Sequence, residues 1–308
     1  MKILITGSSG MVGKNLIEDL RFQKFELLMP SRKELDLFNY DSVFSYIKKN
    51  KPDFIIHLAG RVGGIQANLK NPVEFLVENL DINRNVITAA FKANIKNLLN
   101  FGSSCMYPRE AKNPLSEDLI LKGELEPTNE GYALAKITAQ RLCSYIMMQD
   151  EAFSYKTLIP CNLYGRHDKF SPEHSHLVPA VVRKLHLAKM NNETTVEIWG
   201  DGTARREFMY SADVADCVYK AVIDFKTMPE VVNCGLGFDY SVNEYYTAAA
   251  DVIGYKGSFT HDLTKPVGMK QKLVSTDLAK TWGWQSKTTL TDGLTKTYQF
   301  FLKLENNI

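Results

Sequence analysis

Tyr132 and Lys136 lie four residues apart in a stretch that is rich in alanine and leucine. This composition favours a helix, and residues four apart share one helix face. An ammonium beside a phenol favours the phenolate, so it moves the tyrosine pKa from about 10 towards a range in which the group can donate and recover a proton. We therefore expect Tyr132 to be a general acid whose pKa Lys136 lowers. Pairs with this spacing also arise by chance, so the interpretation depends on the elements around them.

A glycine-rich turn near the N-terminus is the first of these elements. The apolar run 2–6 predicts a strand, and the glycines follow it, ahead of an amphipathic helix that extends to about Leu20. Such glycines permit a tight turn, close approach of the backbone to a pyrophosphate and close packing of helix on strand. The pattern predicts a dinucleotide site formed by Gly7, Ser9, Gly10, Met11, Val12 and Gly13.

The residues after the second predicted strand, 25–29, indicate which dinucleotide binds. An NAD site places a carboxylate there for the ribose hydroxyls, whereas this chain has Ser31, Arg32 and Lys33. We predict NADP (NADPH) as the cofactor, with Arg32 as its cationic contact; the alternative is that Arg32 and Lys33 only begin a solvated helix. Asp36 and Leu37, taken as the end of a short third strand, are predicted to face the adenine.

A fourth strand is predicted over 53–60. It runs into glycines that allow close approach of a ligand, so Leu58, Ala59 and Gly60 are assigned to the cofactor site. His57 lies among apolar neighbours and is interpreted as a core histidine.

A long helix, from 72 to about 94, leads to a fifth strand over 97–101, which delivers Ser103 and Cys105. Strands that alternate with helices indicate a parallel sheet, and ligands bind beyond the carboxyl ends of such strands. The turn at Gly7, the turn at Gly60 and Ser103 all fall at that edge.

The second half of the chain departs from this alternation. After a strand at 155–160 come Asn162 and Leu163, a polar loop over 166–175, and a basic amphipathic helix over 180–190. Trp199 begins a turn into a strand that carries Arg205 and Arg206, a pair suited to a diphosphate or to simple surface solvation.

We therefore expect an α/β fold, with a doubly wound parallel (Rossmann) sheet and a smaller C-terminal α/β substrate lobe. Residues 1–165 would form the NADP-binding Rossmann domain, with 203–235 returning to it. Residues 166–202 and 236–308 would form the substrate-binding lobe.

Composition excludes several classes of protein. The 37 Lys and Arg nearly balance the 35 Asp and Glu, so no basic field indicates nucleic acid. No apolar run approaches the ~20 residues that cross a bilayer, and residue 1 leads directly into a strand, so we expect neither membrane insertion nor a signal peptide and place the protein in the cytoplasm. Five scattered cysteines without paired spacing argue against disulfides or a metal site.

Two further motifs are Ser-Ser-Cys-Met-Tyr-Pro at 103–108 and Ser-His-Leu-Val-Pro-Ala at 175–180. On these motifs and those above, the chain resembles the GDP-L-fucose synthases, a branch of the extended short-chain dehydrogenase/reductases. The resemblance covers nearly the whole chain. It implies epimerisation of GDP-4-keto-6-deoxy-D-mannose at C3 and C5, followed by reduction at C4 with NADPH.

The resemblance also implies residue roles. Tyr132 and Ser103 would donate to the C4 oxygen, and Lys136 would hold the nicotinamide ribose. Cys105 would be the base of the epimerisation, as a thiolate favoured by nearby positive charge, and His176 the acid on the opposite face. Asn162, Leu163 and His176 would also contact the cofactor, while the substrate-binding residues would be Lys184, Trp199, Arg206 and Lys272.

Four positions depart from the family pattern. Ser9 and Lys184 stand where an arginine is common, and the segment 265–272 lacks an Asp and an Arg at Val267 and Gln271. NADP preference therefore depends on Arg32, and sugar contacts near 267 are expected to differ.

Alternatives within the enzymes are the same chemistry on a related sugar, giving GDP-L-colitose, or C4 reduction of a GDP-6-deoxy-heptose. A non-catalytic NADP-binding regulatory protein is the alternative of another class. The resemblance further implies a homodimer, through a four-helix interface.

Overall fold

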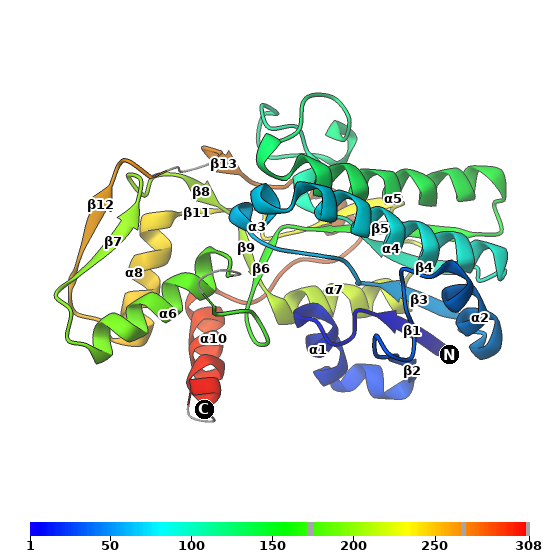
Figure 1. Cartoon of the computed structure of the whole chain (residues 1–308), viewed down its shortest axis with the longest axis horizontal. Helices are drawn as coiled ribbons and strands as arrows, with labels where there is room; N and C mark the ends of the chain where they lie inside the picture. The colour runs from blue at the N-terminus through cyan, green and yellow to red at the C-terminus, as the bar shows by residue number, and fades with distance from the viewer. Residues whose placement is uncertain (172–174, 266–268, 306–308) are drawn as a thin grey trace.

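A six-stranded parallel sheet is the core of the computed structural model, which describes residues 1–171, 175–265 and 269–305 (Figure 1). Its strand order is β10-β5-β4-β3-β1-β2. The strands are β1 (Lys2–Thr6), β2 (Glu26–Leu28), β3 (Phe54–His57), β4 (Asn97–Phe101), β5 (Ser154–Pro160) and β10 (Val231–Cys234). This confirms the predicted fold class.

Strand order reverses at β1, which pairs with β2 on one side and with β3 on the other. Ile3, Leu4 and Ile5 of β1 have no exposed surface, as expected for a central strand covered on both faces. A ligand crevice in such a sheet lies beyond the carboxyl ends of the two strands at the reversal.

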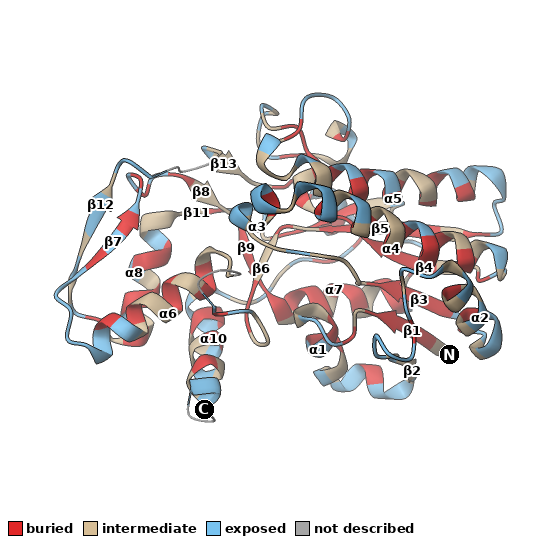
Figure 2. Cartoon of the chain, in the orientation of Figure 1, coloured by how far each residue is buried: buried red, intermediate tan, exposed pale blue. Residues whose placement is uncertain are grey.

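Helices cover both faces of the sheet. On one face lie α1 (Met11–Glu18) and α7 (Ser211–Ile223), and on the other α2 (Tyr40–Asn50), α4 (Pro72–Lys92) and α5 (Glu130–Gln149). Figure 2 shows their buried stripes turned to the strands. The helix α4 was predicted closely, because its apolar periodicity runs from Pro72 without a break.

A smaller lobe lies beside the sheet and has a hydrophobic core of its own, which includes Val181, Ile198, Tyr245 and Phe301. It contains α6 (Leu177–Met190), β7 (Thr195–Trp199), α8 (Val242–Ile253), β12 (Ser258–Asp262) and α10 (Leu290–Glu305). Strands β7 and β12 pair in parallel.

Short strands connect the sheet to the lobe. One group is β11-β8-β13, with β8 (Arg205–Arg206) between β11 (Tyr240–Ser241) and β13 (Gln271–Lys272). The other is β6 (Asn162–Tyr164) with β9 (Phe208–Tyr210). The remaining helices are α3 (Ile65–Lys70), α9 (Asp277–Thr281) and the single-turn elements η1 (Leu20–Lys24), η2 (Ser104–Met106), η3 (Glu117–Leu119) and η4 (Pro127–Asn129).

Two local predictions and one alternative interpretation were wrong. No strand forms at Asp36 and Leu37, because the Asp36 carboxylate accepts a hydrogen bond from Phe38 N at 3.0 Å and closes a turn. Arg32 and Lys33 lie in a turn and begin no helix. Helix α6 begins at Leu177 instead of 180, since proline is tolerated in a first helical turn.

Within the described ranges, no helix is both long enough and apolar enough to cross a membrane.

Candidate active site

The glycine turn after β1 forms a cradle that side chains would fill. A Cβ on Gly13 would lie 2.6 Å from the Gly7 carbonyl oxygen, and one on Gly7 would lie 2.8 Å from Ala59 N. Gly7 also has a φ of +72°, which disfavours other residues. Gly10 is the N-cap of α1 and no side chain caps that helix, so its first N–H groups are available to an anion. The cradle fits the pyrophosphate of a dinucleotide.

The loop after β3 lies against this cradle. His57 is fully buried and hydrogen-bonded to the Thr6 hydroxyl at 2.7 Å and to Asn83 at 3.0 Å, which confirms a core histidine. Burial and the Lys136 charge lower the His57 pKa to about 3, so the ring is neutral. Gly60 faces Asn79, whose Oδ1 would lie 2.9 Å from a Cβ there. These contacts place Leu58, Ala59 and Gly60 at the carboxyl end of β3.

Arg32 lies in the exposed turn after β2. It makes no hydrogen bond or ion pair with any described residue. In the same turn the Glu34 carboxylate is bound to Ser31 N at 2.8 Å. Leu37 is fixed to α4, since Asn85 Nδ2 donates to its carbonyl oxygen at 2.9 Å. An uncommitted cation beside the dinucleotide cradle suits a phosphate on the adenosine ribose.

Tyr132 and Lys136 share α5, but the ammonium is not directed at the phenol. Lys136 Nζ donates to the Phe101 carbonyl oxygen at 2.8 Å, and it lies 5.9 Å from the centre of the Tyr132 ring. Burial raises the Tyr132 pKa above its ordinary value, the nearby Cys105 raises it further, and the hydrogen bond with the Ser103 hydroxyl lowers it. The prediction that Lys136 lowers the Tyr132 pKa is therefore wrong for this arrangement, because the Lys136 ammonium is held at the end of β4.

Cys105 lies beside Ser103 at the start of η2. Cys105 N donates to Ser103 Oγ at 3.3 Å. The sulfur accepts from Asn129 Nδ2 at 3.2 Å and from Lys272 Nζ at 3.5 Å. The structure thus brings together Ser103 and Cys105 of η2 and its N-cap, Tyr132 of α5 and Lys272 of β13.

His176 is the N-cap residue of α6, at the edge of the lobe. Its pKa is lowered by burial and then by the charge of Lys169. The preceding carbonyl, of Ser175, lies 3.7 Å from the position of a Cβ on Gly64, so this end of α6 faces the loop after β3. No described contact joins His176 to Cys105.

The two adjacent arginines of β8 differ in their surroundings. Arg205 is bound to the Asp239 carboxylate at 2.5 Å and serves the lobe structure. Arg206 is half-buried, and burial lowers its pKa while Asp239 and Glu126 raise it. Register places Arg206 opposite Tyr240 of β11 and Lys272 of β13, so the three side chains share one face.

The other predicted substrate residues lie in the lobe. Lys184 Nζ donates to the Glu197 carbonyl oxygen, and burial lowers the lysine pKa. Trp199 lies two residues after Glu197 on β7, and 52% of its surface is exposed. Lys265 Nζ lies 5.7 Å from the centre of the Trp199 ring. Val267, where the family pattern differs, lies outside the described residues.

Glu207 is a buried group that the sequence did not single out. Its carboxylate accepts from Leu236 N at 2.6 Å, Gly237 N at 3.0 Å and Val274 N at 2.9 Å. Burial raises its pKa to about 7. Its carbonyl oxygen accepts from Asn162 Nδ2 at 3.2 Å, which holds that predicted cofactor residue and its neighbour Leu163 in β6. A lone acid between an arginine and an aromatic residue gives no sequence signal of burial.

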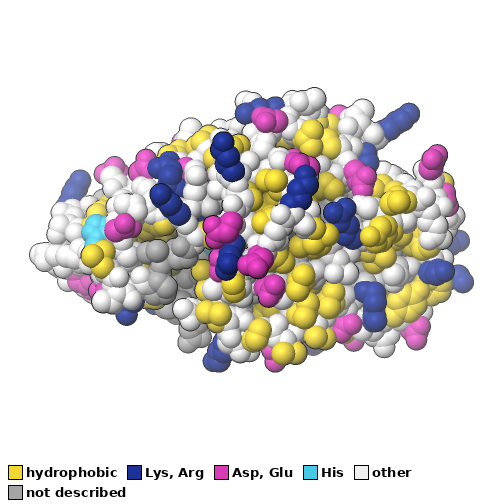
Figure 3. All heavy atoms as spheres, turned by 90° about the horizontal axis from the view of Figure 1, so that it is seen from above, with side chains coloured by type: hydrophobic (Ala, Val, Ile, Leu, Met, Phe, Trp, Pro, Cys, Tyr) yellow, Lys and Arg dark blue, Asp and Glu magenta, His cyan; other side chains and the backbone are white. Residues whose placement is uncertain are grey.

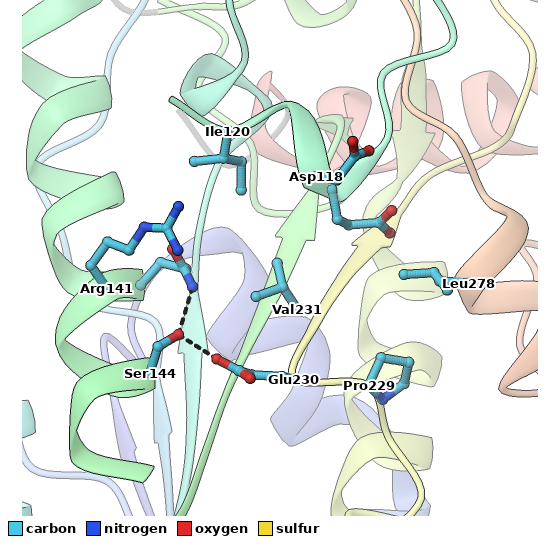
Figure 4. Close-up of a pocket in the computed structure, with 10 residues that line it drawn as sticks. Asp118, Ile120, Arg141, Ser144, Pro229, Glu230, Val231 and Leu278 are labelled. Atoms are coloured by element: carbon cyan, nitrogen blue, oxygen red, sulfur yellow. Dashed lines mark hydrogen bonds between the residues drawn. The ribbon is translucent and has the colours of Figure 1, made fainter. Parts of the chain in front are cut away.

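A cavity of about 360 Å³ lies elsewhere, between α5 and the edge strand β10 (Figure 4). Ser144, Glu230 and Arg141 line it, and none of the side chains around Cys105 does. Among the described residues, no three His, Cys, Asp or Glu side chains converge as metal ligands would.

Residues 3–235 match the model of the NAD dependent epimerase/dehydratase family. The chain belongs to this family. A GDP-L-colitose synthase from Yersinia pseudotuberculosis is 53% identical over 307 residues, all of both chains, and a GDP-L-fucose synthase from Azorhizobium caulinodans is 45% identical over 98% of this chain and 96% of its own. Among solved structures, a GDP-D-glycero-L-gluco-heptose synthase from Campylobacter jejuni, determined in the presence of NADPH, superimposes with a TM-score of 0.90 at 32% identity, over 98% of each chain.

The NAD dependent epimerase/dehydratase match ends at residue 235. It includes the glycine turn, Cys105 and Tyr132, but not β13. Lys272 therefore comes from the part of the chain that the family model does not describe.

Proposed function

We propose that this chain is an NADPH-dependent epimerase-reductase that acts on a GDP-4-keto-6-deoxy sugar. The observation that carries this proposal is the meeting of Ser103, Cys105 and Tyr132 at the carboxyl edge of the sheet. A ketone reductase needs only the hydroxyl and the phenol, whereas a thiol that accepts from Asn129 and Lys272 is suited to proton abstraction. The product that we predict is GDP-L-fucose, from GDP-4-keto-6-deoxy-D-mannose.

The cofactor site in this proposal consists of the glycine cradle, Arg32 and the loop of Leu58, Ala59 and Gly60. When bound, NADPH supplies the hydride that reduces the C4 carbonyl. Lys136 orients the nicotinamide ribose, and its pKa of about 8, lowered by burial, leaves it mostly charged at pH 7. Arg32 donates to the 2′-phosphate, which distinguishes NADP from NAD.

The C4 ketone makes the protons on C3 and C5 acidic, because removal of either gives an enolate with its charge on the C4 oxygen. Tyr132 and Ser103 donate to that oxygen in all three steps. Cys105 removes the proton on one face, and His176 returns one to the other. Because burial lowers the pKa of His176, its imidazolium is a stronger acid than that of an ordinary histidine.

The GDP moiety, in this proposal, lies between the lobe and β8. Arg206 and Lys184 contact the diphosphate, and the exposed ring of Trp199 contacts the base. In our proposed division of the chain, residues 1–165 with 203–235 form a Rossmann domain and residues 166–202 with 236–308 form a substrate lobe, so the diphosphate would lie between the two. Free cysteines at all five positions agree with a cytoplasmic location.

Homodimerisation is also proposed. One face of α5 carries Leu134, Tyr145 and Met148 on the outside, and α4 beside it carries Val73 and Val77, all exposed. Figure 3 looks onto the side that bears these helices and shows hydrophobic side chains spread across it. Exposed apolar stripes on two adjacent helices suit a four-helix interface between two copies.

A second substrate has its own support. The 53% identity to a GDP-L-colitose synthase exceeds the 45% identity to a GDP-L-fucose synthase, which favours a 3,6-dideoxy sugar. With no hydroxyl at C3, that reaction inverts C5 alone.

The deciding experiment is turnover of each GDP-4-keto sugar with NADPH in heavy water, read by mass spectrometry and proton NMR. Deuterium at C3 and C5 of an L-fucose product supports the main proposal. Deuterium at C5 alone supports the second substrate. NADPH oxidation without deuterium in the product would mean that the protein only reduces C4 and does not epimerise. If no sugar were turned over, the protein would not be an enzyme of this class.

A further inference from the structure

The Cys105 sulfur lies between two nitrogen donors. Asn129 Nδ2 is 3.2 Å from Sγ, and Lys272 Nζ is 3.5 Å from it. All five cysteines lie in the described part of the chain, and Cys105 is the one that is not buried. An ammonium and an amide N–H both favour the thiolate over the thiol, because each places positive charge beside sulfur.

Lys272 reaches the sulfur from a strand whose position is fixed by β8. The parallel pairing of β13 with β8 places Lys272 opposite Arg206. Two residues after it, Val274 N donates at 2.9 Å to the buried Glu207 carboxylate. The carboxylate therefore fixes the register of the strand that carries the lysine.

The same strand is also bound to the loop that follows Cys105. Leu273 N donates to Asn113 Oδ1 at 2.7 Å, and Leu115 N donates to the Leu273 carbonyl oxygen at 2.8 Å. The backbone on either side of the sulfur–ammonium contact is thus held by hydrogen bonds that do not depend on that contact.

Two titratable groups face Cys105 within the described structure, Lys272 from β13 and Tyr132 from α5. The phenol is neutral at pH 7, since burial raises its pKa. Ser103 and Asn129 carry no net charge. Lys272 is therefore the group that brings a full positive charge to the sulfur.

We propose that Lys272, assisted by Asn129, holds Cys105 as a thiolate and so positions the base of the epimerisation. This inference rests on the proposed function for the reaction that the thiolate serves. In that reaction the bond from C3 or C5 to hydrogen breaks, an S–H bond forms on Cys105, and the electron pair passes to the C4 oxygen as an enolate. Lys272 neither gains nor loses a proton.

The test needs no substrate. Alkylation of the intact protein by iodoacetamide is followed against pH, with Cys105→Ser as the background. In Lys272→Met we expect the inflection of this profile to move up by about 1–3 pH units, the effect of removing an opposite charge at this distance. Lys272→Arg keeps the charge and should restore the inflection, and Asn129→Asp, which adds an anion beside the sulfur, should raise it.

Lys270→Met is the matched control, because Lys270 is exposed and precedes the same strand. Its profile should equal that of the unmodified protein. An unchanged inflection in folded Lys272→Met overturns the proposal. A rise in KM would not rescue it, because a lysine that only binds substrate does not change the alkylation of the thiol in the absence of substrate. If Lys272→Met fails to fold, an unchanged inflection in Asn129→Asp overturns it.

Deuterium exchange separates this inference from the proposed function. A shifted inflection in a protein that exchanges no GDP-4-keto sugar supports the thiolate and refutes the epimerase. Normal exchange with an unshifted inflection supports the epimerase and refutes the role of Lys272. When both hold, Lys272→Met should lose about 10-fold or more in exchange rate at pH 7, and regain it as the pH rises past the new inflection.

Discussion

Lys136 Nζ donates to the carbonyl oxygen of Phe101, at 2.8 Å. The ammonium is therefore held at the end of β4, on the strand that leads to Ser103. The hydroxyl of Ser103, and not Lys136, is the group that lowers the Tyr132 pKa. The phenol is thus influenced by the serine that follows β4, whereas the lysine one helical turn away is directed at the strand backbone.

Tyr132→Phe should lower the rate of C4 reduction by about 10²–10⁴, the usual contribution of a positioned acid. NADPH affinity should change little, because the ring remains to pack edge-on against Phe75 and the glycine cradle is untouched. Steady-state kinetics and fluorescence titration of NADPH measure the two effects. A variant with near-normal turnover would show that the phenol is not the acid.

Cys105→Ser should separate the two activities. We expect deuterium incorporation at the inverted carbons to fall by about 10²-fold or more, because a hydroxyl is not ionised at neutral pH, while the C4 ketone is still reduced. Cys143→Ala, which changes a buried cysteine on a different element, α5, should leave the ratio of the two activities unchanged. Equal loss of inversion and reduction in Cys105→Ser would contradict the base assignment.

Gly13→Ala should both destabilise the fold and weaken NADPH binding. The new Cβ would lie 2.6 Å from the Gly7 carbonyl oxygen and from Ser8 Cα, which are backbone atoms, so the turn must open. Thermal unfolding should show a loss of about 1–3 kcal/mol. Gly64→Ala is the control for stability, since its nearest neighbour would be 3.7 Å away. Unchanged melting and NADPH affinity in Gly13→Ala would refute the cradle.

Much of the sheet could be predicted from the sequence, because its central strands are short apolar runs bounded by glycine or polar residues. Lys2–Thr6 and Asn97–Phe101 form strands with the predicted ends. The error at Asp36 arose because its carboxylate accepts a hydrogen bond from the backbone N–H of Phe38. In the sequence, such a turn cannot be distinguished from the end of a strand.

The candidate site was predictable only where its residues lie in one motif. The cluster of Ser103, Cys105 and Tyr132 follows from local spacing and from the family resemblance. The approach of Lys272 to Cys105 could not be predicted, because it depends on the register of two-residue strands and joins positions 167 apart. Glu207 was missed for a similar reason, since its three donors come from two distant segments.

Glu207→Gln should change how stability depends on pH. The Glu207 pKa is raised to about 7 in the folded chain, above the ordinary value of 4.5. The folded state therefore holds the proton more tightly, so this contribution to stability is full below about pH 4.5 and is lost as the pH rises to about 7. Glutamine stays neutral throughout.

Urea unfolding at a series of pH values measures this effect. The unmodified protein should lose up to about 3 kcal/mol relative to Glu207→Gln between pH 4.5 and 7, since one pKa unit corresponds to about 1.4 kcal/mol. Above pH 7 the difference should be constant. A difference that does not vary over the whole range would mean that Glu207 does not titrate there.

Tyr145→Glu combined with Met148→Glu should convert a dimer into a monomer. The two side chains are 61% and 78% exposed on α5, and charges there would be desolvated in a helix-to-helix interface. Light scattering after size-exclusion chromatography gives the mass. Leu20→Glu, at a position 73% exposed in η1 on the other face of the sheet, is the control and should leave the mass unchanged. A monomeric unmodified protein would refute the dimer.

The contact of Glu207 with Val274 spans 67 residues and has a consequence for biosynthesis. A ribosome completes the glycine turn, Tyr132 and the last strand of the sheet, β10, before it reaches the residues that satisfy this carboxylate and approach Cys105. The nascent chain thus acquires the thiol of Cys105 long before the lysine that approaches it. A chain released ahead of residue 272 would contain the thiol but lack the charge beside it.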